Sequence, residues 1–165
     1  MSPASFWGSK VRQFHAHRRA RVGRNERDAL ADWLTTDQLA LFDSMHVADR
    51  RHGLDVVATL RNEGATDPEL LLAGLLHDAG KGNTGVWPRV VYSLGQRYGG
   101  GIWRLAAIMP GGRRAIARLH DHAEASGRLA AAAGCSARTV ALIRDQDEPL
   151  DPEFGELLRT ADEAN

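Results

Sequence analysis

A repeated pattern of helix starts and stops is the feature that most limits how this chain can fold. Asp67 followed by Pro68 is typical of a helix N-terminus, because aspartate caps the first turn and proline fits its first position. Asp151 and Pro152 repeat the pattern, and Gly64 stands where a preceding helix would end. No stretch alternates apolar and polar residues in the way that indicates a β-strand. The sequence therefore predicts an all-α fold.

A chain of 165 residues suits one domain, and the local signals predict a single multi-helix domain. Residues 1–27 are predicted to form a basic N-terminal helical extension. Residues 83–118 are predicted to form a basic, aromatic helical lid or insert on the bundle. The expected helices cover residues 37–42 with Thr36 as the cap, 47–62, 69–79, 88–98, 102–109, 114–121, 122–133, 137–145 and 151–164.

Charge is distributed unevenly although the chain is neutral overall, with 21 basic and 21 acidic side chains. Residues 1–27 hold seven Lys or Arg against one acid, and residues 79–120 hold seven against none. Residues 28–78 and 145–165 are correspondingly acidic. Solvated helix faces explain any single zone, but asymmetry of this kind indicates partners or site electrostatics. The acid-free stretch favours an anionic substrate.

Composition excludes several other classes of protein. With 43% apolar and 25% charged residues, the chain is typical of a globular protein rather than a disordered one. It has no apolar run near the roughly 20 residues of a membrane span, and no secretory signal is expected. The single cysteine, Cys135, rules out an internal disulfide and suits a reducing cytoplasm, where we expect the protein to act.

Four polar residues fall on or beside helix faces that the apolar pattern turns toward the core: His52, His77, Asp78 and Asp162. A carboxylate that faces a core must be paired, hydrogen-bonded or bound to a metal, because an isolated buried charge is very costly. Imidazole nitrogen and carboxylate oxygen together suit Mn²⁺, Fe²⁺, Ni²⁺ or Zn²⁺ better than Ca²⁺. Taken singly, each residue has a simpler explanation as a core histidine, a helix C-terminal pair or a solvent-facing aspartate.

Three short segments carry these residues: Arg51-His52, Leu-Leu-His77-Asp78-Ala-Gly-Lys81 and Leu-Leu-Arg-Thr-Ala-Asp162. In this order and helical placement, the chain resembles the HD-domain metal-dependent phosphohydrolase superfamily over residues 36–165. The His-Asp doublet in its Leu-Leu context is the most specific part of the match. The resemblance implies an HD-domain helical bundle of five or more core helices over residues 28–165, with the N-terminal helix as an addition.

The resemblance also implies a divalent cation, either Mn, Fe, Ni, Co, Zn or Mg, held by His52, His77, Asp78 and Asp162. A water activated by that cation would cleave a phosphomonoester or phosphodiester of a small, nucleotide-like substrate. Asp78 would also orient the water. Lys81 and Arg51 would bind the phosphate, although Lys81 is explained equally well as a solvated loop cation.

A second cluster follows the basic stretch, around His122. In relatives with two metals a histidine at this place helps to form a second site, so His122 and Asp145 are candidate ligands there. Residues 144–146 read Arg-Asp-Gln where such relatives carry histidines, which argues against a complete second site. His122 is alternatively a general acid for the leaving oxygen, or a solvent-facing residue at a helix start.

Two other functions remain open at this point. One is an HD-type oxygenase with two irons, which needs the second metal site. The other is a non-catalytic HD-fold binding or adaptor module. The expected partner is a small phosphorylated substrate rather than nucleic acid. The basic segments leave peripheral membrane contact open, and the N-terminal extension allows a homodimer.

Overall fold

A computed structural model describes residues 21–82 and 121–165, and every regular element in these two ranges is helical, which confirms the all-α class there. The elements are α2 (Arg24–Leu30), α3 (Thr36–Ser44), α4 (Val47–Asn62), α5 (Pro68–Leu76), the short 3₁₀ helix η1 (Ala79–Lys81), α9 (His122–Ala132), α10 (Ala137–Arg144) and α11 (Gly155–Ala164). Among the described residues, no helix has the length and apolar character needed to span a membrane. The predicted insert at 83–118 and most of the extension at 1–27 lie outside the described residues.

Helix starts follow the local signals of the sequence. Asp67 Oδ1 accepts hydrogen bonds from the backbone N–H groups of Glu69 and Leu70, at 2.8 and 3.3 Å, so α5 starts where predicted. Thr35, rather than the predicted Thr36, caps α3. Its hydroxyl accepts from Gln38 N–H at 3.3 Å, and the Gln38 side chain accepts from Thr35 N–H at 3.0 Å. This reciprocal capping box satisfies two backbone donors at once.

Three boundaries differ from the prediction. The Asp151 carboxylate accepts from the backbone N–H groups of Glu153 and Phe154 in a turn, so α11 begins only at Gly155. Helix α5 ends at Leu76, and the chain then turns into η1 rather than continuing to residue 79. Helix α2 spans the expected boundary between residues 27 and 28.

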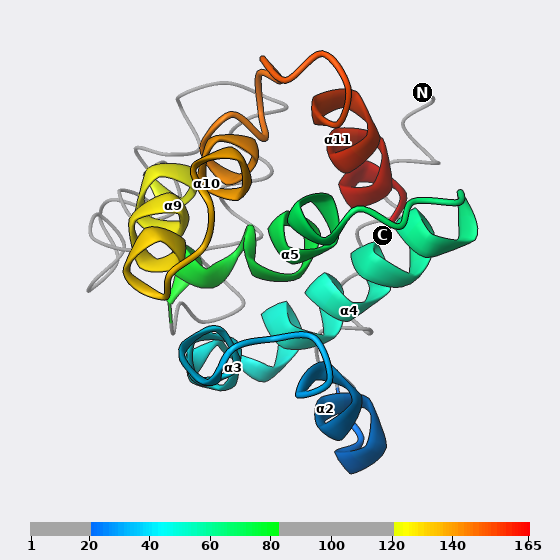
Figure 1. Ribbon diagram of the computed structural model, residues 1–165, viewed down its shortest axis with the longest axis vertical. Coiled ribbons are helices and arrows are strands. Elements are labelled where there is room, and N and C mark those ends of the chain that lie inside the picture. The colour runs from blue at the N-terminus through cyan, green and yellow to red at the C-terminus, as the bar shows by residue number, and fades with distance from the viewer. Residues whose placement is uncertain (1–20, 83–120) are drawn as a thin grey trace, which may run out of the picture.

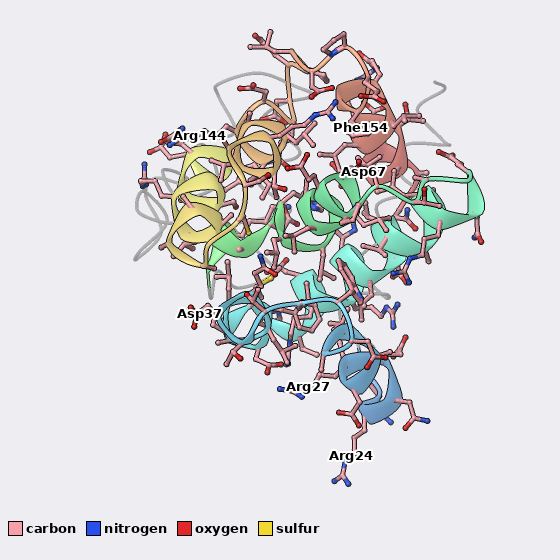
Figure 2. All side chains as sticks on the ribbon, viewed as in Figure 1. Arg24, Arg27, Asp37, Asp67, Arg144 and Phe154 are labelled. Carbon is pink, nitrogen blue, oxygen red and sulfur yellow. The ribbon has the colours of Figure 1, made fainter. Side chains whose placement is uncertain are left out.

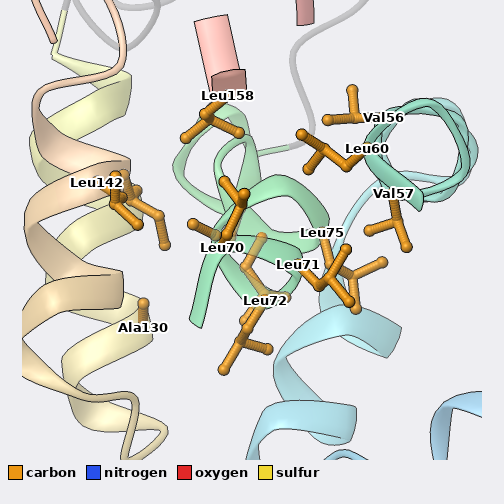
Figure 3. Close-up of a cluster of buried hydrophobic side chains, with 14 of the residues drawn as sticks. Val56, Val57, Leu60, Leu70, Leu71, Leu72, Leu75, Ala130, Leu142 and Leu158 are labelled. Carbon is orange, nitrogen blue, oxygen red and sulfur yellow. The ribbon is translucent and has the colours of Figure 1, made fainter. Parts of the chain in front are cut away.

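Helix α5 forms the centre of the bundle and packs against α4, α10 and α11 (Figure 1). All of its residues from 70 to 76 are buried, which explains why this segment is the most continuously apolar part of the chain. Figure 3 shows its leucines among side chains of the neighbouring helices, including Val56, Leu60, Leu142 and Leu158. The end of α5 is therefore fixed from several sides.

Helix α2 lies at the outer edge of the molecule and is held by ion pairs (Figures 1 and 2). Arg27 donates to Asp43 of α3, with its closest contact at 2.6 Å. Glu26 accepts from Arg51 of α4, also at 2.6 Å. Leu30 adds a buried apolar contact.

Candidate metal centre

The site begins at a close crossing of α4 and α5. A Cβ atom on Gly53 would lie 2.4 Å from the backbone oxygen of Leu75, so only glycine permits this approach. His52, directly before Gly53, and His77, two residues after Leu75, consequently come together with ring centroids 5.1 Å apart in an edge-to-face arrangement. Helix packing thus places two imidazoles side by side that are 25 residues apart in the sequence.

His77 is oriented by the end of its own helix. Its Nδ1 donates to the Gly74 carbonyl at 2.9 Å, which directs Nε2 toward the carboxylates. Nε2 lies 3.3 Å from Asp162 Oδ1 and 3.4 Å from Asp78 Oδ1. Neither contact has hydrogen-bond geometry, and the atom is buried without a hydrogen-bond partner. A backbone bond on one ring nitrogen with the other directed at ligand groups is typical of metal-binding histidines.

Asp162 of α11 completes a cluster with the two histidines. Its Oδ1 lies 2.7 Å from His52 Nε2, and one ligand atom from each of His52, His77 and Asp162 lies within 4.8 Å of the others. Ligands about 2.1 Å from a metal at right angles stand about 3 Å apart. The separations of 2.7 and 3.3 Å therefore fit a small divalent cation, as does the mixed nitrogen and oxygen donor set.

Asp78 is adjacent to this cluster and is 2% exposed. Its Oδ2 is ion-paired with Lys81 Nζ, three residues along the chain. Its Oδ1 has no hydrogen-bond partner and lies 3.4 Å from His77 Nε2 and 3.9 Å from His122 Nε2. One carboxylate thus joins the lysine on one side to two histidines on the other.

Mutual charge controls the protonation of the cluster. Burial alone would lower the pKa of His77, but the Asp78 and Asp162 carboxylates outweigh burial and raise that pKa to about 9. Burial opposes ionisation of Asp78, yet the charges of His77 and Lys81 bring the pKa of Asp78 well below its usual range. Bonding to His52 likewise lowers the pKa of Asp162 despite its burial. The carboxylates are therefore ionised at neutral pH.

The loop after Asp78 is anchored on α9. Gly80 N–H donates to Ser126 Oγ at 2.8 Å, and Ser126 is fully buried. A Cβ atom on Gly80 would lie 2.5 Å from the His122 carbonyl oxygen, so η1 lies directly against the first turn of α9. No sequence motif indicates Ser126, which is recognisable only as a small polar residue one turn after His122.

The structure brings together five of the predicted site residues and adds His122 at their edge. His52, His77, Asp78, Asp162 and Lys81 form one connected group. Arg51, predicted to bind substrate, forms ion pairs with two carboxylates, Glu26 and Asp55. Asp145 ends α10 as its C-cap and is not in the potential metal cluster found among the described residues.

Comparison with protein-family models, curated proteins and solved structures found no match to the chain.

Proposed function

We propose that this protein is a metal-dependent phosphohydrolase of the HD type, acting on a phosphomonoester or phosphodiester of a small, nucleotide-like molecule. The observation that carries the proposal is a pair of buried atoms without hydrogen-bond partners, His77 Nε2 and Asp78 Oδ1. They lie 3.4 Å apart at the end of the central helix. Leaving such groups unsatisfied is costly, and a shared cation would satisfy both.

The residues that would hold the cation are His52, His77, Asp78 and Asp162. A divalent cation there would supply a Lewis acid that lowers the pKa of water and offsets charge on a phosphoryl oxygen. A ligand set of two carboxylates and two imidazoles carries less negative charge than one made only of carboxylates, which suits an anionic substrate.

Two further side chains have roles that their positions support. Lys81 holds Asp78 Oδ2 and places an ammonium group beside the cluster, where it would attract a phosphoryl group. His122 Nε2 stands 3.9 Å from Asp78 Oδ1 and is 12% exposed, within reach of a bound substrate. An imidazole there is suited to giving a proton to the leaving oxygen.

Metal analysis of the purified protein, followed by hydrolysis assays with Mn²⁺, Ni²⁺, Co²⁺ and Mg²⁺ on a panel of phosphate esters, tests the proposal. We expect a bound divalent metal and hydrolysis that Asp78→Asn abolishes. Asp151→Asn, a carboxylate outside the cluster, is the control and should leave both unchanged. A protein that binds none of these metals, or full activity in Asp78→Asn, would contradict the proposal.

A further inference from the structure

Buried polar atoms without partners occur outside the candidate metal centre as well as within it. Four buried side-chain atoms have no hydrogen-bond partner among the described residues: Arg50 Nε, His77 Nε2, Asp78 Oδ1 and Gln146 Nε2. Two of them belong to the candidate metal centre. Gln146 comes directly after the α10 C-cap, is 8% exposed and is not one of the candidate metal ligands.

Contacts at the start of α10 place Gln146 at the level of the centre. Thr139, in the first turn of α10, donates through Oγ1 to the Glu69 carbonyl in the first turn of α5, at 3.3 Å. Helix α10 continues for five residues beyond Thr139 to Arg144, and the buried Gln146 follows its C-cap, Asp145, so Gln146 lies at the opposite end of α10 from this contact. Seven residues beyond Glu69 is Leu76, the last residue of α5 before His77.

Contacts with α9 give the same placement independently. A Cβ atom on Gly127 would lie 2.6 Å from Arg144 Cγ, and Arg144 is paired with Glu124 at 3.0 Å. The end of α10 therefore lies beside the first half of α9, whose first turn contacts Gly80 of η1. The ends of α5 and α10 and the start of α9 therefore converge, and the buried Gln146 follows two residues after Arg144.

The Gln146 amide nitrogen differs chemically from His77 Nε2 and Asp78 Oδ1. A cation would satisfy His77 Nε2 and Asp78 Oδ1, because both can present a lone pair. The Gln146 amide nitrogen has only N–H donors and needs an oxygen acceptor. A cation and an adjacent oxygen acceptor would satisfy all three atoms, and a metal-bound phosphoryl group would supply that acceptor.

We propose that Gln146 Nε2 donates a hydrogen bond to a phosphoryl oxygen of the substrate and so contributes to substrate binding and selection. This inference rests on the proposed phosphohydrolase function and assigns a residue to its substrate. A neutral amide adds a directional donor beside Lys81, whose charge attracts any anion. Substrates with an uncharged, weaker acceptor at this place would lose the contact.

A second buried glutamine provides a matched control. Gln38 of α3 is also 8% exposed, but its side chain accepts from Thr35 N–H at 3.0 Å, and neither of its side-chain polar atoms is among the buried atoms without a partner. Gln38 is thus satisfied within the protein. Replacing either glutamine by methionine keeps the approximate size of the side chain and removes its amide.

The test is titration calorimetry of full-length protein with inorganic phosphate in the presence of Mn²⁺, together with thermal unfolding. We expect Gln146→Met to weaken phosphate binding about ten-fold or more, because the lost bond is to a charged acceptor. Its Tm should not fall, since the unsatisfied donor is gone. Gln38→Met should bind phosphate normally and unfold at a lower temperature.

Gln146→Glu keeps the shape of the side chain and replaces the donor by a negative charge, so it should abolish phosphate binding. This variant provides the test if Gln146→Met does not fold. Wild-type affinity in both Gln146 variants would overturn the inference and leave the phosphohydrolase proposal standing, with water as the partner of the amide. Failure of the wild-type protein to bind phosphate while Mn²⁺ is bound would overturn this inference alone, and failure to bind any of the divalent metals would overturn both proposals.

Discussion

Two groups of charged side chains in this protein contain aspartates with lowered pKa values, but they are built differently. At the α10–α11 connection, Arg138 donates to Asp151 at 2.7 and 3.1 Å and to Glu153 at 2.7 Å. Its guanidinium also lies 4.1 Å from the centre of the Phe154 ring (Figure 2 labels Phe154). Side-chain and backbone donors there lower the pKa of Asp151 and satisfy its carboxylate.

The cluster at the end of α5 has similar charges but incomplete bonding. Asp78 is almost fully buried, and its Oδ1 has no hydrogen-bond partner. The groups around Asp78 are imidazoles and one ammonium group rather than a guanidinium, which binds carboxylates with two parallel bonds. A lowered carboxylate pKa therefore does not by itself identify a site. The unsatisfied buried atoms distinguish the candidate site from the structural ion pair.

The largest expected difference between the two groups is in metal affinity. Asp162→Asn should lower the affinity for Mn²⁺ by about 100-fold, because a neutral amide replaces a charged ligand beside His52 and His77. Asp151→Asn should leave it unchanged. Titration calorimetry with Mn²⁺ measures both variants, and equal affinities would show that the α5 cluster is also only structural.

The crossing that creates the cluster should be sensitive to a single methyl group. Gly53→Ala should destabilise the fold by about 1–3 kcal/mol and weaken Mn²⁺ binding, because the new Cβ meets the backbone of Leu75. Gly74→Ala is the control, since its nearest neighbours at 3.0 and 3.2 Å are the side-chain ends of Leu60 and Val56, which can move. Urea unfolding compares the two. A smaller cost for Gly53→Ala than for Gly74→Ala would contradict the close crossing.

The anchor of the Asp78 loop should matter for both stability and metal binding. Ser126→Ala removes the acceptor of Gly80 N–H, which should cost about 1–3 kcal/mol and lower Mn²⁺ affinity about ten-fold. Ser136→Ala removes the N-cap of α10, at a cost of about 1 kcal/mol, without affecting the metal. If both serine variants lose stability and neither loses affinity, the loop is not held in place by Ser126.

Acid should reduce the contribution of the Arg138–Asp151 ion pair to the stability of the fold by a small amount. The pKa of Asp151 is lower in the folded protein than in the unfolded chain, so its contribution is present above the ordinary value of about 3.9 and is lost as the pH falls below it. Arg138→Gln should therefore lower Tm at pH 7, and the deficit should shrink below pH 4. Thermal unfolding measured between pH 3 and 7 tests this, and a constant deficit would contradict it.

Local signals predicted most of the described fold. The cap at Asp67, the starts of the helices at residues 47, 122 and 137 and the all-α class depend on neighbours in the sequence and were predicted correctly. The end of α5 was not, because it is set by the His77–Gly74 bond and by the contact of η1 with α9. Tertiary contacts of this kind leave little trace in the sequence.

The candidate site shows the same limit. The helical spacing of His52, His77 and Asp162 indicated one cluster, and the structure brings their ligand atoms together. The ion pair of Arg51 with Glu26 depends on where α2 lies, and no motif specifies that. Gly80, Ser126 and Gln146 matter through contacts between helices, so residue type alone could not single them out.

The contact between His52 and Asp162 joins residues that are 110 positions apart in the sequence. A cation held by both would act as a cross-link that closes this long segment. Its binding free energy would offset the entropy cost of closing the segment only while the cation stays bound. Chelation should therefore loosen α11 before the rest of the bundle, and hydrogen exchange in residues 155–164 would report metal occupancy directly.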